Sequence, residues 1–97
     1  MFKFEITNIE GIKRIEFSIN YTLNDFENIN SIVSKKYKLV NTFEDVDTDY
    51  YIFDSLEGFQ LVTSYNSLEG IIVFCKDNEN QLEESNQFIV KFSKLFL

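Results

Sequence analysis

The sequence predicts one α+β domain over residues 1–97, in which an antiparallel sheet of about six strands carries two helices in the order β-β-α-β-β-β-β-α. Three observations lead to this prediction. The three glycines of the chain each close a four-residue phrase, NIEG at 8–11 and SLEG at 55–58 and 67–70. Alternating apolar residues flank these phrases. Two further stretches repeat apolar residues at helical spacing.

The first phrase separates two alternating stretches and predicts a β-hairpin. Phe2, Phe4 and Ile6 share one face of the first strand, and RIEFSIN at 14–20 alternates in the same way. We expect the glycine to adopt a positive φ angle in a type I turn followed by a glycine bulge, because glycine does so without steric strain. The Asn8 side chain is expected to cap this turn.

The two SLEG phrases predict two more hairpin turns, between strands at 50–54, 59–65 and 71–75. Ser55 and Ser67 are expected to cap these turns, where the first turn has asparagine. The three strands are apolar on both faces, although helices on one side of an antiparallel sheet normally leave polar residues on the other. Either both faces are covered, or the second face is a contact surface.

Two segments carry helix signals. Thr22 and Asp25 form a capping-box pattern, and the apolar residues that follow have a helical period, which predicts a helix over 23–36. A second helix is expected from Asn80, with Glu83 three residues further on, to the C-terminus. Acidic residues lie early and lysines late in both segments, as the helix dipole favours.

Between the first helix and the second hairpin, YKLVNTFE at 37–44 predicts a further strand, and EDVDTD at 44–49 predicts an acidic loop. The D-x-D-x-D spacing in this loop matches the first three ligand positions of an EF-hand calcium loop. The match ends there, because Tyr50 stands where that loop needs glycine and Leu56 where it needs a bidentate glutamate. An opportunistic divalent site is an alternative, but no cofactor or resident metal is expected.

The composition excludes several kinds of chemistry. The chain has no histidine and one cysteine, Cys75, so catalytic triads that use histidine and zinc sites that use histidine or four cysteines are excluded. Neither a P-loop nor a dinucleotide-binding glycine motif is present. Cys75 falls in the apolar stretch IIVFC, which is typical of a buried, unreactive thiol. We therefore expect a protein that is not an enzyme.

The net charge of −7 is concentrated in one part of the chain. Residues 44–84 contain eleven acidic residues and one basic residue, whereas residues 1–43 contain five acidic and six basic residues. Such a surface repels nucleic acid and anionic membranes and attracts basic partners. The first residues alternate between apolar and polar, so we expect no signal peptide. No apolar run is long enough to span a membrane, and the single cysteine suits a reducing compartment. We expect a cytoplasmic protein.

These observations predict a protein-binding surface made of acidic and aromatic side chains. The hypothesis is a bacterial immunity protein or antitoxin that neutralises a cationic, nuclease-type toxin, with carboxylates in place of phosphates and tyrosines as packing anchors. Two alternatives remain: a solvated acidic loop without a partner, and a small structural or regulatory module that forms a homodimer through its apolar sheet face or joins a larger assembly. The candidate contact residues are Asp45, Asp47, Asp49, Tyr50, Tyr51, Asp54 and Glu57.

Overall fold

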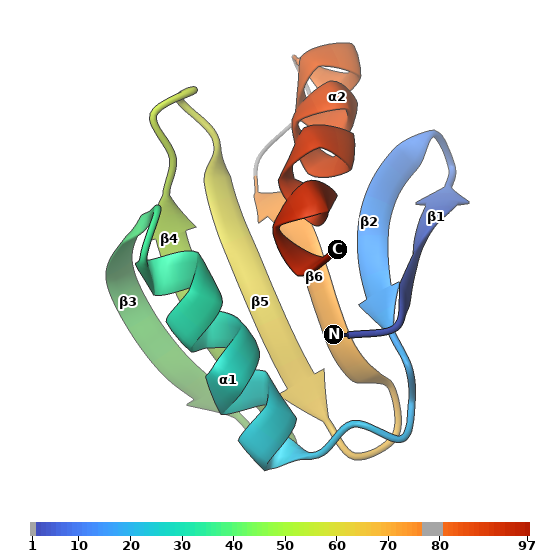
Figure 1. Cartoon of the computed structure of the whole chain (residues 1–97), viewed down its shortest axis with the longest axis vertical. Helices are drawn as coiled ribbons and strands as arrows, with labels where there is room; N and C mark the ends of the chain where they lie inside the picture. Colours follow the sequence, from blue (N-terminus) through green and yellow to red (C-terminus); the bar gives the residue numbers. More distant parts are fainter. Residues whose placement is uncertain (1, 77–80) are drawn as a thin grey trace.

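The computed structural model describes residues 2–76 and 81–97 and confirms the predicted α+β fold and element order. Its sheet has six antiparallel strands in the spatial order β1-β2-β6-β5-β4-β3 (Figure 1). The helices are α1 (Leu23–Ser34) and α2 (Leu82–Ser93), which a short 3-10 turn, η1 (Lys94–Phe96), extends. The strands are β1 (Phe4–Ile9), β2 (Ile12–Phe17), β3 (Lys38–Asp45), β4 (Thr48–Asp54), β5 (Gln60–Asn66) and β6 (Gly70–Lys76).

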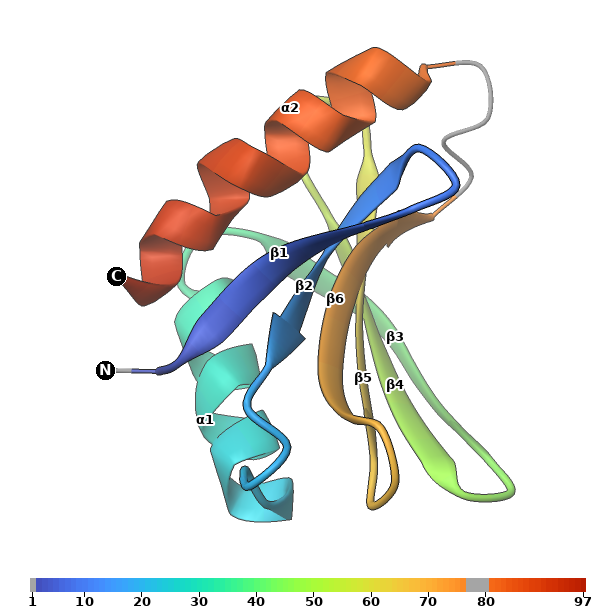
Figure 2. The same cartoon turned by 90° about the vertical axis from the view of Figure 1, so that its right-hand side faces the viewer.

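Both helices pack on the same face of the sheet and enclose one hydrophobic core (Figures 1 and 2). The sheet contributes alternate strand residues, among them Phe53, Leu61 and Val73, and the helices contribute Phe26 and Phe92. Each of these side chains is at most 2% exposed. Burying one such side chain stabilises a fold by about 1.5–3 kcal/mol, so this layer is the main source of stability.

The helix signals in the sequence are confirmed for α1. The Thr22 side chain accepts from the backbone N–H of Asp25, and the Asp25 carboxylate accepts from the backbone N–H of Thr22, which completes the capping box. The expected cap of the second helix, Asn80, lies outside the described residues. Neither helix among the described residues is long and apolar enough to cross a membrane.

The glycine phrases form three hairpin connections, but they do not form the same turn. The three glycines have φ angles between 75° and 89°. In the first connection Ile9 pairs with Ile12, so the turn has only two residues, and Glu10 also has a positive φ angle of 54°. The expected turn with a glycine bulge is therefore wrong there, because positive φ angles at both positions of a two-residue hairpin are the signature of a type I′ turn.

The expected side-chain caps are confirmed in two of the three connections. Asn8 Oδ1 accepts from the backbone N–H of Gly11, and Ser55 Oγ accepts from that of Phe59. In the third connection Asn66, rather than Ser67, is the capping residue. Its Oδ1 accepts from two consecutive backbone N–H groups in the turn. A longer amide side chain at the last strand position reaches these donors.

The acidic stretch at 44–49 is not a loop, which corrects the prediction from the sequence. β3 continues to Asp45, β4 starts at Thr48, and only two residues connect them. Acidic residues are rare in strands, so the composition of this stretch favoured a loop. Backbone pairing continues to the turn, and the acidic residues therefore occupy fixed positions at the tip of a β-hairpin.

Both helices of the described residues lie on one side of the sheet, and neither covers the opposite face (Figure 2). Ile52, Val62 and Ile72 project from this face and lie outside the core formed with the helices. They are nevertheless only 7%, 4% and 7% exposed, because neighbouring side chains of the twisted sheet shield them. A dimer through this face stays a prediction, and it would bury little further surface from these three side chains.

Candidate functional site

The structure divides the predicted acidic residues between the two ends of β4. Asp45, Asp47 and Asp49 lie at or beside the β3–β4 turn, at the lower end of the sheet in Figure 1. Asp54 ends β4 at the opposite end, and Glu57 lies in the connection beyond it. Because a strand advances about 3.3 Å per residue, roughly 15–20 Å separates the two groups. They cannot form one compact patch.

The two groups also differ in their bonding. Asp54 accepts a hydrogen bond from Gln60, and Glu57 forms an ion pair with Lys91 at 3.7 Å. The two ion pairs found within residues 2–76 and 81–97 are this one and the pair between Arg14 and Glu16. The carboxylates at the β3–β4 turn thus have no cationic partner in the described part of the chain. No cation among the described residues balances the negative charges of Asp45, Asp47 and Asp49.

Tyr50 and Tyr51 point to opposite faces of the sheet. Tyr51 is part of the layer beneath α1, where its ring contacts Phe26 at a centroid distance of 5.4 Å. Tyr50 stacks on Phe43 of the neighbouring strand, on the face without helices. Tyr50 is therefore the tyrosine that a molecule on the open face could contact, whereas Tyr51 packs against the hydrophobic core.

An acidic groove of about 340 Å³ lies between the first turns of α1 and the β3–β4 hairpin. Glu27 borders it from the helix, and Glu44 and Asp49 border it from the two strands. The other residues that line it are apolar, aromatic or uncharged: Leu23, Phe26, Thr42, Phe43, Tyr50 and Tyr51.

The electrostatics of this acidic groove are unfavourable in the isolated chain. Glu44 and Asp49 are directly paired across the two strands, and like charges in that position destabilise a hairpin. Glu27 adds a third carboxylate from the helix. No lysine or arginine occurs between residues 39 and 75 to compensate them. A cationic side chain from another molecule would relieve this repulsion.

A metal ion fits this arrangement less well than a cationic side chain. No group of three histidine, cysteine, aspartate or glutamate side chains in residues 2–76 and 81–97 is placed to hold a metal ion. An arginine or lysine needs no such close convergence, since it forms hydrogen bonds with carboxylates spread around a groove.

Sequence reasoning missed three residues that the structure adds to this site. Glu27 was counted among the early acidic residues of the first helix, and Phe43 was assigned to the expected strand. Glu44 was assigned both to the end of that strand and to the start of the expected acidic loop. The alternation of the strands contained a usable signal, because Glu44 lies two residues before the first residue of a two-residue turn and Asp49 lies two residues after the second. That signal appears only once the turn is placed at 46–47 rather than across the whole acidic stretch.

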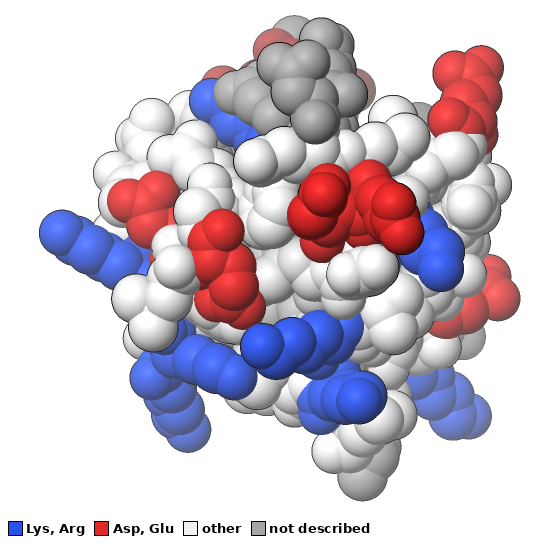
Figure 3. Space-filling model, turned by 90° about the horizontal axis from the view of Figure 1, so that it is seen from above, with Lys and Arg blue, Asp and Glu red and all other residues white. Residues whose placement is uncertain are grey.

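The acidic surface continues from the groove to the neighbouring connection. Asp47 and Glu69 line a second, shallow depression between the β3–β4 and β5–β6 turns. The opposite end of the molecule, viewed in Figure 3, carries both signs of charge. The described residues therefore form a strongly acidic end and a mixed end, and long-range electrostatic attraction would draw a cationic molecule to the acidic end.

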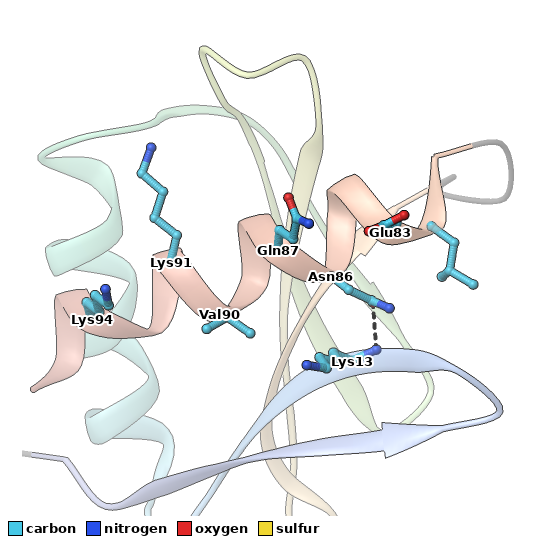
Figure 4. Close-up of a pocket in the computed structure, with 8 residues that line it drawn as sticks. Lys13, Glu83, Asn86, Gln87, Val90, Lys91 and Lys94 are labelled. Atoms are coloured by element: carbon cyan, nitrogen blue, oxygen red, sulfur yellow. Dashed lines mark hydrogen bonds between the residues drawn. The ribbon is translucent and has the colours of Figure 1, made fainter.

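A second groove, of about 710 Å³, lies between α2 and the β1–β2 hairpin (Figure 4). Asn86 connects the two elements, because its Oδ1 accepts from the backbone N–H of Lys13 and its amide donates to the carbonyl of Gly11. Lys91 and Gln87 point away from the hairpin in Figure 4. The polar groups of this groove therefore hold the fold together or face solvent, and they do not converge on a ligand.

The single cysteine offers no reactive group. Cys75 is 5% exposed, and burial raises the pKa of its thiol from 9.0 to about 12. A thiol with such a pKa is protonated at neutral pH and is a poor nucleophile.

No protein-family model, curated protein or solved structure matches this chain.

Proposed function

We propose that this chain is a cytoplasmic protein-binding protein that neutralises a basic partner with its acidic groove, as a bacterial immunity protein or antitoxin does against a nuclease-type toxin. One observation carries the proposal. Glu27, Glu44 and Asp49 line one groove, and none of them forms an ion pair within the described residues. Repulsion among these carboxylates destabilises the isolated chain, and a cationic partner reduces that repulsion.

The geometry supports a rigid recognition surface. Asp45 and Asp47 are held at the tip of a two-residue hairpin, so little conformational entropy is lost when they are engaged. The exposed Phe43, stacked on Tyr50, supplies apolar area beside the charges. Aromatic anchors surrounded by charges are typical of tight protein interfaces.

A nuclease-type toxin is the partner class that this charge pattern favours. Such an enzyme must present a cationic surface to bind the phosphates of its substrate. A set of fixed carboxylates at the tip and groove can occupy that surface and exclude the substrate. Asp54 and Glu57 lie at the other end of β4, and we assign them no part in this contact.

Co-expression with the product of the neighbouring gene tests this proposal. The tagged chain is expected to retain a basic protein in stoichiometric amount at moderate salt, and that protein should be toxic alone and inactive in the complex. A triple variant, Glu27→Gln, Glu44→Gln and Asp49→Asn, should lose the partner. The matched control, Glu10→Gln, Asp54→Asn and Glu83→Gln, changes the net charge equally and should keep it. Absence of a partner with the wild type, or equal retention by both variants, contradicts the proposal.

A further inference from the structure

β3 forms a long free edge of the sheet. It is the last strand in the sheet order, and all eight of its residues are exposed. The exposed residues include three large apolar side chains, with Leu39 at 40%, Val40 at 42% and Phe43 at 45%. β1, at the other edge, has only six residues. A free edge offers unpaired backbone N–H and C=O groups to another strand, and proteins usually shorten or cover such edges.

The charges along this edge are complementary to themselves. Lys38 starts β3, and Lys35 and Lys36 lie just before it. Glu44 and Asp45 end the strand. When two copies of one strand pair antiparallel about a two-fold axis, the first end of each lies beside the last end of the other. The basic end of each copy would therefore meet the acidic end of its partner.

Strand parity selects one register for such a pair. The bulge between Leu39 and Asn41 sets Val40 outside the regular alternation. Leu39, Thr42 and Glu44 then share the face that the helices cover, because they pair with Phe53, Tyr51 and Asp49 of β4. Lys38, Asn41, Phe43 and Asp45 share the open face.

Side chains opposite one another in a sheet must lie on the same face. Placing the two-fold axis at Thr42 satisfies this condition along the whole strand. It pairs Asn41 with Phe43 and, beyond the bulge, Leu39 with Glu44 and Lys38 with Asp45. The outermost pair on each side is then an ion pair of opposite charges.

We propose that β3 pairs with β3 of a second copy of this chain in this register, so that two sheets join edge to edge. The proposal goes beyond the function proposed above and does not depend on it. Because one pair of strands buries less area than a standard protein interface, the dimer is weak and forms at high protein concentration. Its end contacts are exposed ion pairs, so added salt weakens it.

Sedimentation equilibrium of the full chain, at concentrations up to about 1 mM, tests this proposal. The wild type should dimerise, and each of the single variants Lys38→Glu and Asp45→Lys should weaken the dimer by about tenfold or more, since each replaces two attractive pairs with repulsive ones. An equimolar mixture of the two variants should dimerise again. In the mixed pair, the two substituted side chains face each other with opposite charges, and the native Lys38–Asp45 pair remains at the other end.

The mixture shows whether a single variant is monomeric because an ion pair is lost or because the variant does not fold. Misfolded variants would not restore dimerisation when they are mixed. The control Lys94→Glu changes an exposed lysine on another element and should leave the dimer intact. Three results would overturn the proposal: a monomeric wild type over this range, single variants that dimerise like the wild type, or a mixture that stays monomeric.

Discussion

Phe43 and Tyr50 stack across β3 and β4 with ring centroids 4.6 Å apart and ring planes 17° apart, on the sheet face that carries no helix. The pair stiffens the hairpin that carries the acidic groove. A stacked aromatic pair contributes about 0.5–1.5 kcal/mol beyond its burial. Phe43→Ala should therefore lower the free energy of unfolding by about 1 kcal/mol or more in urea titrations. Val46→Ala, at a position that is 98% exposed, is the control and should change it by less than about 0.5 kcal/mol.

The paired acids Glu44 and Asp49 predict opposite effects on stability and on binding. Glu44→Gln removes a like-charge pair and should raise the free energy of unfolding by about 0.2–1 kcal/mol, while it weakens the complex with the basic partner. Asp54→Asn is the matched control, because Asp54 lies opposite Lys38 across the same hairpin. Removing its negative charge should lower the free energy of unfolding slightly. A Glu44→Gln variant that is less stable than the wild type would show that the repulsion is already compensated.

The buried contact between Asn30 and Thr63 predicts strongly non-additive substitutions. Thr63 Oγ1 donates to Asn30 Oδ1, and the Asn30 amide nitrogen is buried without a hydrogen-bond partner among the described residues. Thr63→Val should cost about 1–3 kcal/mol, because it leaves the rest of the amide unpaired as well. Adding Asn30→Leu should recover most of this loss. Urea unfolding of both single variants and the double variant measures the coupling, and additive effects would contradict this account.

The buried thiol of Cys75 predicts a loss of stability at alkaline pH. Its pKa is about 12 in the folded protein and 9.0 without burial. Between these values the unfolded chain releases the proton and the folded chain retains it, so stability is complete below about pH 9 and falls as the pH rises toward 12. Cys75→Ala should lose less stability across this window than the wild type, as urea titrations at several pH values would show. If the stability of Cys75→Ala and of the wild type changed in parallel with pH, the thiol would have the same pKa in the folded and unfolded chains.

Much of the fold was predictable because local signals agree with it. The capping box of Thr22 and Asp25 and the positive φ angle of Gly58 depend on interactions within a few residues, so the sequence contains them directly. The placement of both helices on one face was not predictable from the strands, because Ile52 and Val62 are as apolar as the residues of the core. Mutual shielding on a twisted sheet buries them without a covering helix.

The candidate site was predictable only in part. Proximity in sequence grouped Asp49 with Asp54, yet an extended strand carries them to opposite ends of the sheet. The partner of Asp49 is instead Glu44, which strand pairing places opposite it, together with Glu27 from a separate helix. Such contacts depend on register and on helix packing, and neither is contained in a short stretch of sequence.

The association rate of the co-purified partner, measured by stopped flow at low and high salt, tests the central claim most directly. For the wild type, association should be fast at low salt and slow steeply as salt is added. Asp47→Lys with Asp49→Lys should slow association at low salt by about tenfold or more, whereas the equally charged control, Glu10→Lys with Asp54→Lys, should have a smaller effect. If the hairpin variant and the wild type share the same rate and salt dependence, the acidic groove is not where the partner binds.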